Sequence, residues 1–229
     1  MAALHQIYLE TGQKKTFAGA MDWPGWCRSG KDENGALAAL MDYRTRYQKI
    51  LKMCNFSFEP PSDLSELVVV ERWKGNATTD FGSPFIILKF DQKPTDPLVY
   101  ERWRKILAAC WQAFDQTRIN AVGKELKKGP RGGSRDLNKM IQHLLEADQH
   151  YLKRLAWKHP LDPAQEDTDA LKDIRRGILA GLTIAEQGDL PPEGLKGGQI
   201  WPPSYFVRRV AWHLLDHLWE IEDRLVLSV

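Results

Sequence analysis

The spacing of apolar residues differs between the two halves of the chain. In the first half, apolar and β-branched residues come in short runs bounded by turn formers, which is typical of strands. In the second half they recur at three- and four-residue steps over four long stretches, which indicates amphipathic helices. The pattern predicts an α+β protein, with a small α+β domain over residues 1–92 and an up-down four-helix bundle over residues 96–229.

Four short runs in the first half are predicted strands: residues 5–11, 15–21, 67–72 and 85–90. The stretch Thr11-Gly12-Gln13-Lys14 is typical of a hairpin turn between the first two strands. Residues 21–36 are rich in glycine and other turn formers. A helix is expected from Glu33 to Leu51, where the apolar positions recur at helical steps.

Four stretches in the second half are predicted helices: Pro97 to Asn120, Ser134 to Leu155, Asp167 to Gln187 and Pro203 to Val226. Asp96 and Ser134 are suited to cap the first two helices, because their side-chain oxygens can accept backbone N–H groups. Gly188 and the prolines that follow it end the third helix. Bundles of four such helices often hold metal ions between facing helices.

Charge and composition exclude several function classes. The 32 basic and 30 acidic residues leave a net charge of +2. So small a charge produces too weak a positive field to hold a nucleic-acid backbone. The basic stretch from Lys124 to Arg135 is expected to be a solvated loop between helices. No apolar run of ~18 residues and no apolar leader segment is present, so neither a membrane span nor a signal peptide is expected. The three cysteines form no CxxC pair, which favours reduced thiols and a cytoplasmic protein.

Two of the six histidines form a pattern with chemical meaning. His213 and His217 are four residues apart, so on a helix both imidazoles lie on one face. That spacing lets two ring nitrogens bind one ion, and a third ligand then comes from another helix. The second predicted helix offers His143 and His150, of which His143 is favoured. The alternative is that the histidines are half-buried residues that bind nothing, because two histidines four apart also occur by chance.

The three favoured histidines lie on the flanks of the apolar stripes of their helices, taking about 100° per residue. Flanking positions face the groove between helices, so a metal ion there would be open to solvent on one side. Three protein ligands and one open position are the arrangement of a catalytic metal site. Three carboxylates are candidates to orient the imidazoles through their second nitrogens: Glu146, Asp216 and Glu220.

The sequence around these histidines resembles a known family. HLLEADQHYLKRL at 143–155 and RRVAWHLLDHLWEIEDRL at 208–225 resemble the two signature helices of the DinB-like (DinB/YfiT-like) family. His143 matches the histidine that opens the family's HLxExx stretch, and His213 and His217 match its HxxxH pair. The resemblance covers roughly residues 97–226.

The resemblance implies a four-helix bundle in which three histidines bind a divalent metal ion, zinc or nickel. It also implies a small-molecule substrate and a low-molecular-weight thiol as cosubstrate, in a transferase, isomerase or hydrolase reaction. A metal ion favours thiolate over thiol and so produces a nucleophile at neutral pH. The alternative is a non-catalytic protein that senses a metal or ligand, or that interacts with another protein.

The first half, roughly residues 1–75, resembles a HicB-like module. Trp23-Pro24-Gly25-Trp26-Cys27 and Ser29-Gly30 stand where that family has a "PGCxxxG"-like turn between a strand pair and a helix. HicB antitoxins carry a DNA-binding element, whereas no helix-turn-helix or ribbon-helix-helix pattern occurs here. The module is therefore expected to shape or cover the cleft of the bundle, or to mediate formation of a homodimer.

Overall fold

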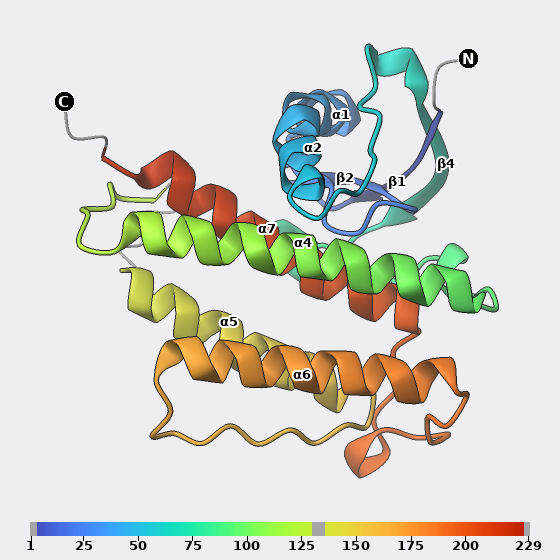
Figure 1. Ribbon diagram of the computed structural model, residues 1–229. Helices are drawn as coiled ribbons and strands as arrows, with labels where there is room; N and C mark the ends of the chain where they lie inside the picture. The colour runs from blue at the N-terminus through green and yellow to red at the C-terminus, as the bar shows by residue number, and fades with distance from the viewer. Residues whose placement is uncertain (1–3, 130–135, 227–229) are drawn as a thin grey trace. The chain divides into compact units, whose positions relative to one another are not determined.

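The computed structural model describes residues 4–129 and 136–226, and the chain divides into two compact units between Pro94 and Thr95 (Figure 1). The α+β class is confirmed, because a four-stranded sheet near the N-terminus is followed along the chain by long helices. Within the described residues, no helix is both long and apolar enough to cross a lipid bilayer.

The N-terminal unit is built on one sheet with the strand order β3-β2-β1-β4. Its strands are β1 (His5–Thr11), β2 (Thr16–Ala20), β3 (Cys27–Gly30) and β4 (Leu67–Lys74). The predicted hairpin is confirmed, since β1 and β2 are antiparallel with Thr11 opposite Thr16. β4 lies parallel to β1 on the other side. β3 was not predicted, because its four residues lie in the stretch whose glycines favour turns.

The predicted helix over 33–51 is two helices, α1 (Glu33–Asp42) and α2 (Arg44–Lys52). The break has a local cause at Tyr43, whose N–H bonds to the carbonyl three residues back, at Leu40. The Arg44 guanidinium then donates to the Met41 carbonyl at 2.8 Å, a carbonyl that would otherwise accept the next N–H of a continuous helix.

An aromatic cluster fixes these helices and the preceding turn. The Trp26 indole N–H donates to the Leu40 carbonyl at 3.0 Å, and the Tyr47 hydroxyl donates to the Pro24 carbonyl at 2.8 Å. The two rings stack with centroids 6.1 Å apart, and Phe58 packs edge-on against both. The polar ends of these buried aromatic side chains are therefore satisfied by backbone, which sets the path of the turn.

The predicted strand at 85–90 is wrong, and two carboxylates of the sheet, Glu10 and Glu71, give the reason. Glu10 on β1 is fully buried and accepts the backbone N–H groups of Phe85 and Ile86 at 3.0–3.1 Å. Glu71 on β4 accepts the N–H groups of Lys89 and Phe90. Because side chains take these donors, most N–H groups of the segment are not available for a strand ladder. It passes from α3 (Ala77–Phe81) in extended form into a 3₁₀ turn at Phe90–Gln92.

The C-terminal unit contains four long helices: α4 (Pro97–Ala121), α5 (Leu137–Lys153), α6 (Asp167–Glu186) and α7 (Pro203–Arg224). α7 packs on α4 and α5, and α6 packs on α5 and α4, so the four helices surround a shared apolar core (Figure 1). Asp96 caps α4 as predicted, accepting the Leu98 N–H at 2.7 Å. Ser134 lies outside the described residues, and Asp136 caps α5.

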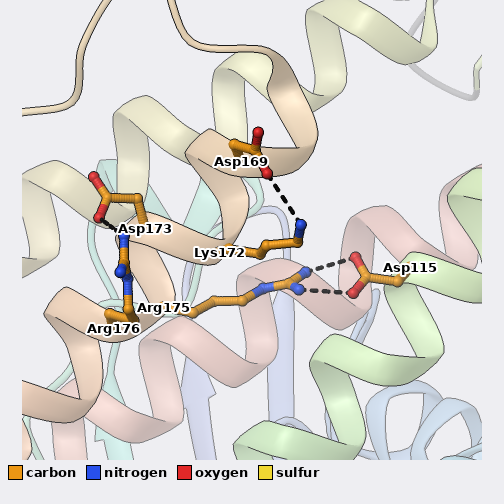
Figure 2. A network of polar contacts seen from close by, with 6 residues as sticks. All are labelled: Asp115, Asp169, Lys172, Asp173, Arg175 and Arg176. Carbon is orange, nitrogen blue, oxygen red and sulfur yellow. Dashed lines mark hydrogen bonds and ion pairs between the residues drawn. The ribbon is translucent and has the colours of Figure 1, made fainter.

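A paired charge ties α6 to α4 at the edge of this core (Figure 2). The Arg175 guanidinium donates to both oxygens of Asp115, at 2.7 and 2.9 Å. Two further pairs, Lys172 with Asp169 and Arg176 with Asp173, stay within α6 and are solvent-exposed on at least one side. The two-pronged Arg175 pair is the stronger link, because its geometry is fixed and its arginine is largely buried.

The carboxylate of Asp148 on α5 is also buried in this unit, since the residue is only 6% exposed. Burial raises the pKa of the Asp148 carboxyl to about 7, while the positive charge of Arg175 partly opposes this shift. The folded chain therefore holds a proton on Asp148 over a pH range in which the unfolded chain has lost it.

This proton makes stability depend on pH. Between about pH 4 and pH 7 the folded state binds more protons at Asp148 than the unfolded state, so stability falls as pH rises through that window. We expect Asp148→Asn to remove this slope and to stabilise the chain above pH 7 by up to about 4 kcal/mol. Chemical denaturation at a series of pH values measures the effect, with the exposed Asp169→Asn as control. An Asp148→Asn profile parallel to that of the wild type would contradict the assignment.

Candidate metal centre

The three favoured histidines come together between two packed helices. His143 lies on α5, while His213 and His217 lie one turn apart on α7. One ligand atom from each ring lies within 4.8 Å of the other two, and no other such group of three occurs among the described residues. His213 and His217 are 7% and 8% exposed, whereas His143 is half-buried at the rim.

The rings point at a common spot. Nε2 of His213 lies 3.1 Å from Nε2 of His143. The three ring centroids are 4.8–5.1 Å apart, and each pair of rings is steeply inclined, at 77–86°. Nitrogens bound to one tetrahedral ion at 2.0–2.1 Å lie about 3.3 Å from one another. The arrangement is therefore close to that of three imidazoles around one ion, and unlike that of stacked rings.

A carboxylate contacts the His217 ring at Nδ1. Nδ1 of His217 lies 3.1 Å from Oε2 of Glu220, and the Arg224 guanidinium donates to Oε1 of Glu220 at 2.8 Å. The hydrogen bond with His217, followed by the nearby positive charges, lowers the pKa of Glu220 to about 2, although burial opposes the shift. A carboxylate that accepts a hydrogen bond from Nδ1–H keeps the proton on Nδ1, so the Nε2 lone pair of His217 is available to an ion.

A second pair of residues borders His213. The Tyr151 ring on α5 is 5.9 Å from the His213 ring, and the Arg209 guanidinium on α7 donates to the Tyr151 hydroxyl at 3.0 Å. Burial raises the pKa of Tyr151. Sequence reasoning did not place this pair at the site. The signal was spacing: Arg209 precedes His213 by four residues, and Tyr151 follows His143 by eight.

The remaining histidines lie elsewhere. His150 is exposed on α5 and is not part of the three-histidine group. The structure therefore favours His143 over His150 as the third ligand. His5 is buried in the N-terminal unit, where its Nε2 lies 3.0 Å from the Glu59 carbonyl oxygen, and burial lowers its pKa. His159 lies 3.4 Å from Asp173.

The three carboxylates proposed to orient the imidazoles have different surroundings. Glu220 is hydrogen-bonded to His217, with 3.1 Å between its Oε2 and the ring Nδ1. Asp216 is half-buried on α7, between the two histidines of the pair in sequence. Glu146 is exposed on the solvent side of α5. Glu220 is therefore placed to position His217.

Comparison with known proteins adds no assignment. No family model matches this chain, and no curated protein or solved structure matches it either. What can be said of the site therefore depends on its own residues, which are three convergent imidazoles, a carboxylate behind one of them, and an arginine–tyrosine pair beside another.

Proposed function

We propose that the C-terminal unit is a metal-dependent enzyme of the DinB-like type, with His143, His213 and His217 holding a divalent zinc or nickel ion. The observation that carries the proposal is the convergence of three imidazoles from two helices. Two neutral Nε2 atoms 3.1 Å apart repel each other unless a proton or a cation lies between them. A cation shared with His217 satisfies all three rings at once, whereas one proton satisfies only two.

An open coordination position supports catalysis over a structural role. Three protein ligands leave at least one position free, and the half-buried rim at His143 gives it access to solvent. A divalent ion held there lowers the pKa of a bound thiol or water and supplies a nucleophile near neutral pH. A low-molecular-weight thiol acting on a small molecule fits this chemistry, and the three cysteines of the chain form no disulfide, as suits a reducing cytoplasm.

Residues of the chain supply orientation around this position. Glu220 fixes the ring of His217, and Arg224 holds Glu220 in place. The Tyr151 hydroxyl accepts a hydrogen bond from Arg209, so its own proton stays available to a substrate oxygen or sulfur near His213. A transferase, isomerase or hydrolase reaction is compatible with these groups.

The N-terminal unit is proposed to be a HicB-like module. Support comes from the order of a β-hairpin, a Trp23-Pro24-Gly25-Trp26 turn and a helix opened by the Asp32 cap. Its function is proposed to be shaping of the active site or association with a second copy, because no DNA-binding pattern accompanies it.

Metal binding is the first test. Protein purified without a chelator or an affinity tag should bind about one zinc or nickel ion per chain by elemental analysis and calorimetric titration. His217→Ala should weaken binding by ~10–100-fold or more, because it removes a ligand. His150→Ala is the matched control and should bind like the wild type. Less than about 0.1 ion per wild-type chain after loading would show that the histidines are structural.

Thiol chemistry is the second test. With the metal-loaded protein, a small thiol and an alkyl halide acceptor, the thiol sulfur attacks carbon, the halide leaves and the thiol proton passes to solvent. We expect metal-dependent turnover above the uncatalysed rate, lost in His217→Ala and on chelation, measured by consumption of free thiol. Full metal binding without turnover, across a panel of thiols and acceptors, would instead favour a non-catalytic metal or ligand sensor.

The role of Glu220 can be tested against the exposed Glu146 of α5. Glu220→Ala should lower metal affinity by ~10–100-fold, because His217 loses the group that orients it. Glu220→Gln should lose less metal affinity, since its amide oxygen can still accept a hydrogen bond from Nδ1–H. Glu146→Ala, which removes an exposed carboxylate from α5, is the control and should leave affinity unchanged. Equal affinities for all three variants, with unchanged circular dichroism, would overturn the positioning role.

A further inference from the structure

A cavity of about 810 Å³ lies at the C-terminal end of α5, apart from the three-histidine group. Its walls come from three segments of the C-terminal unit: residues 149–154 at the end of α5, residues 158–161 after it, and residues 194–199 before α7. A cavity of this volume accommodates a small molecule. None of the three histidines of the candidate metal centre lines it.

The walls of this cavity are basic. Its lining includes five basic side chains and no acidic one: His150, Lys153, Arg154, Lys158 and His159. His159 has a carboxylate partner, Asp173 at 3.4 Å. Among the described residues, no carboxylate lies within ion-pair distance of Lys153, Arg154 or Lys158. Three cations around one concave space attract an anion, and an anion would relieve their mutual repulsion.

Backbone geometry builds the cavity around these cations. Just after α5, Ala156 has a positive φ of 55°, and the Trp157 N–H bonds to the Leu152 carbonyl at 3.1 Å. After this turn the His159 ring lies against Gly177 of α6 and leaves no room for a side chain there. Opposite, the Gly194 N–H bonds to the Gly198 carbonyl at 2.7 Å and closes a glycine turn.

Arg154 connects the cavity to the candidate metal centre. Its carbonyl accepts the Trp201 N–H at 2.9 Å, and its guanidinium lies 5.8 Å from the centre of the Trp201 ring. Trp201 packs on Tyr151, and Tyr151 borders His213. On α5 itself, His150 follows His143 by two turns on nearly the same face, about 10 Å along the axis. A molecule of about that length can reach both places.

We propose that this cavity binds the carboxylate or phosphate group of a small molecule, with Lys153, Arg154 and Lys158 as its cationic contacts. Resting on the proposed function, we infer that this group is the anionic end of the substrate, whose other end reaches the metal centre. Arginine and lysine are the side chains that bind such anions most strongly, arginine through two parallel hydrogen bonds.

The test measures binding of inorganic phosphate and of tricarballylate, a tricarboxylate, to metal-free full-length protein by calorimetry at low ionic strength. We expect saturable binding of one anion per chain, and the more tightly bound probe identifies whether the site prefers phosphate or carboxylate. The double variant Lys153→Gln/Arg154→Gln should bind at least about 10-fold more weakly. Lys172→Gln, which removes an exposed lysine on α6, is the control and should bind like the wild type.

Two outcomes overturn the proposal: no saturable binding of either probe, or equal binding by the wild type and the double variant. His217→Ala separates the cavity from the metal centre, because this variant should keep anion binding while losing metal. If the wild type binds no metal but binds an anion more tightly than the double variant does, the anion site is supported and the proposed enzyme is refuted. Metal binding and turnover with no anion binding would do the reverse.

Discussion

The packing of α5 against α7 is the contact on which the candidate site depends. A single helix can present His213 and His217 on one face, but the third imidazole comes only from a second helix held at a fixed distance. Apolar side chains between the helices set that distance, and the histidines lie at the edge of the same interface. The free energy of core packing thus holds three imidazoles in a geometry that their own interactions would not favour.

Buried and half-buried carboxylates organise both units. Glu10 and Glu71 accept backbone N–H groups and so turn a β-branched segment away from the sheet. Glu220 accepts from an imidazole, and Asp115 accepts both arms of Arg175. Burial, in contrast, raises the pKa of Asp148 to about 7, so that below this pH its carboxyl is mostly neutral. Each carboxylate is compensated by donors, by a cation or by a proton.

Polar side chains along α5 lead from the candidate metal centre to the basic cavity. His143 faces the candidate metal centre, Tyr151 borders it, and Lys153 and Arg154 line the basic cavity beyond. A substrate with a reactive end and an anionic end fits this order. Trp201 and Tyr151 form the apolar link between the two places, which would exclude water from the middle of a bound molecule.

The sequence by itself determined the four long helices, the β-hairpin and the His213–His217 pair, because periodicity and i,i+4 spacing are properties of neighbouring residues. It missed β3 and the local break at Tyr43, and it failed over 85–90, where carboxylates distant in the chain, Glu10 and Glu71, accept the backbone N–H groups. Only the tertiary structure placed His143 beside His213, set Glu220 against His217 and brought the walls of the basic cavity together. The reason is that each of these depends on a distance between separate segments, which packing fixes and local sequence patterns do not encode.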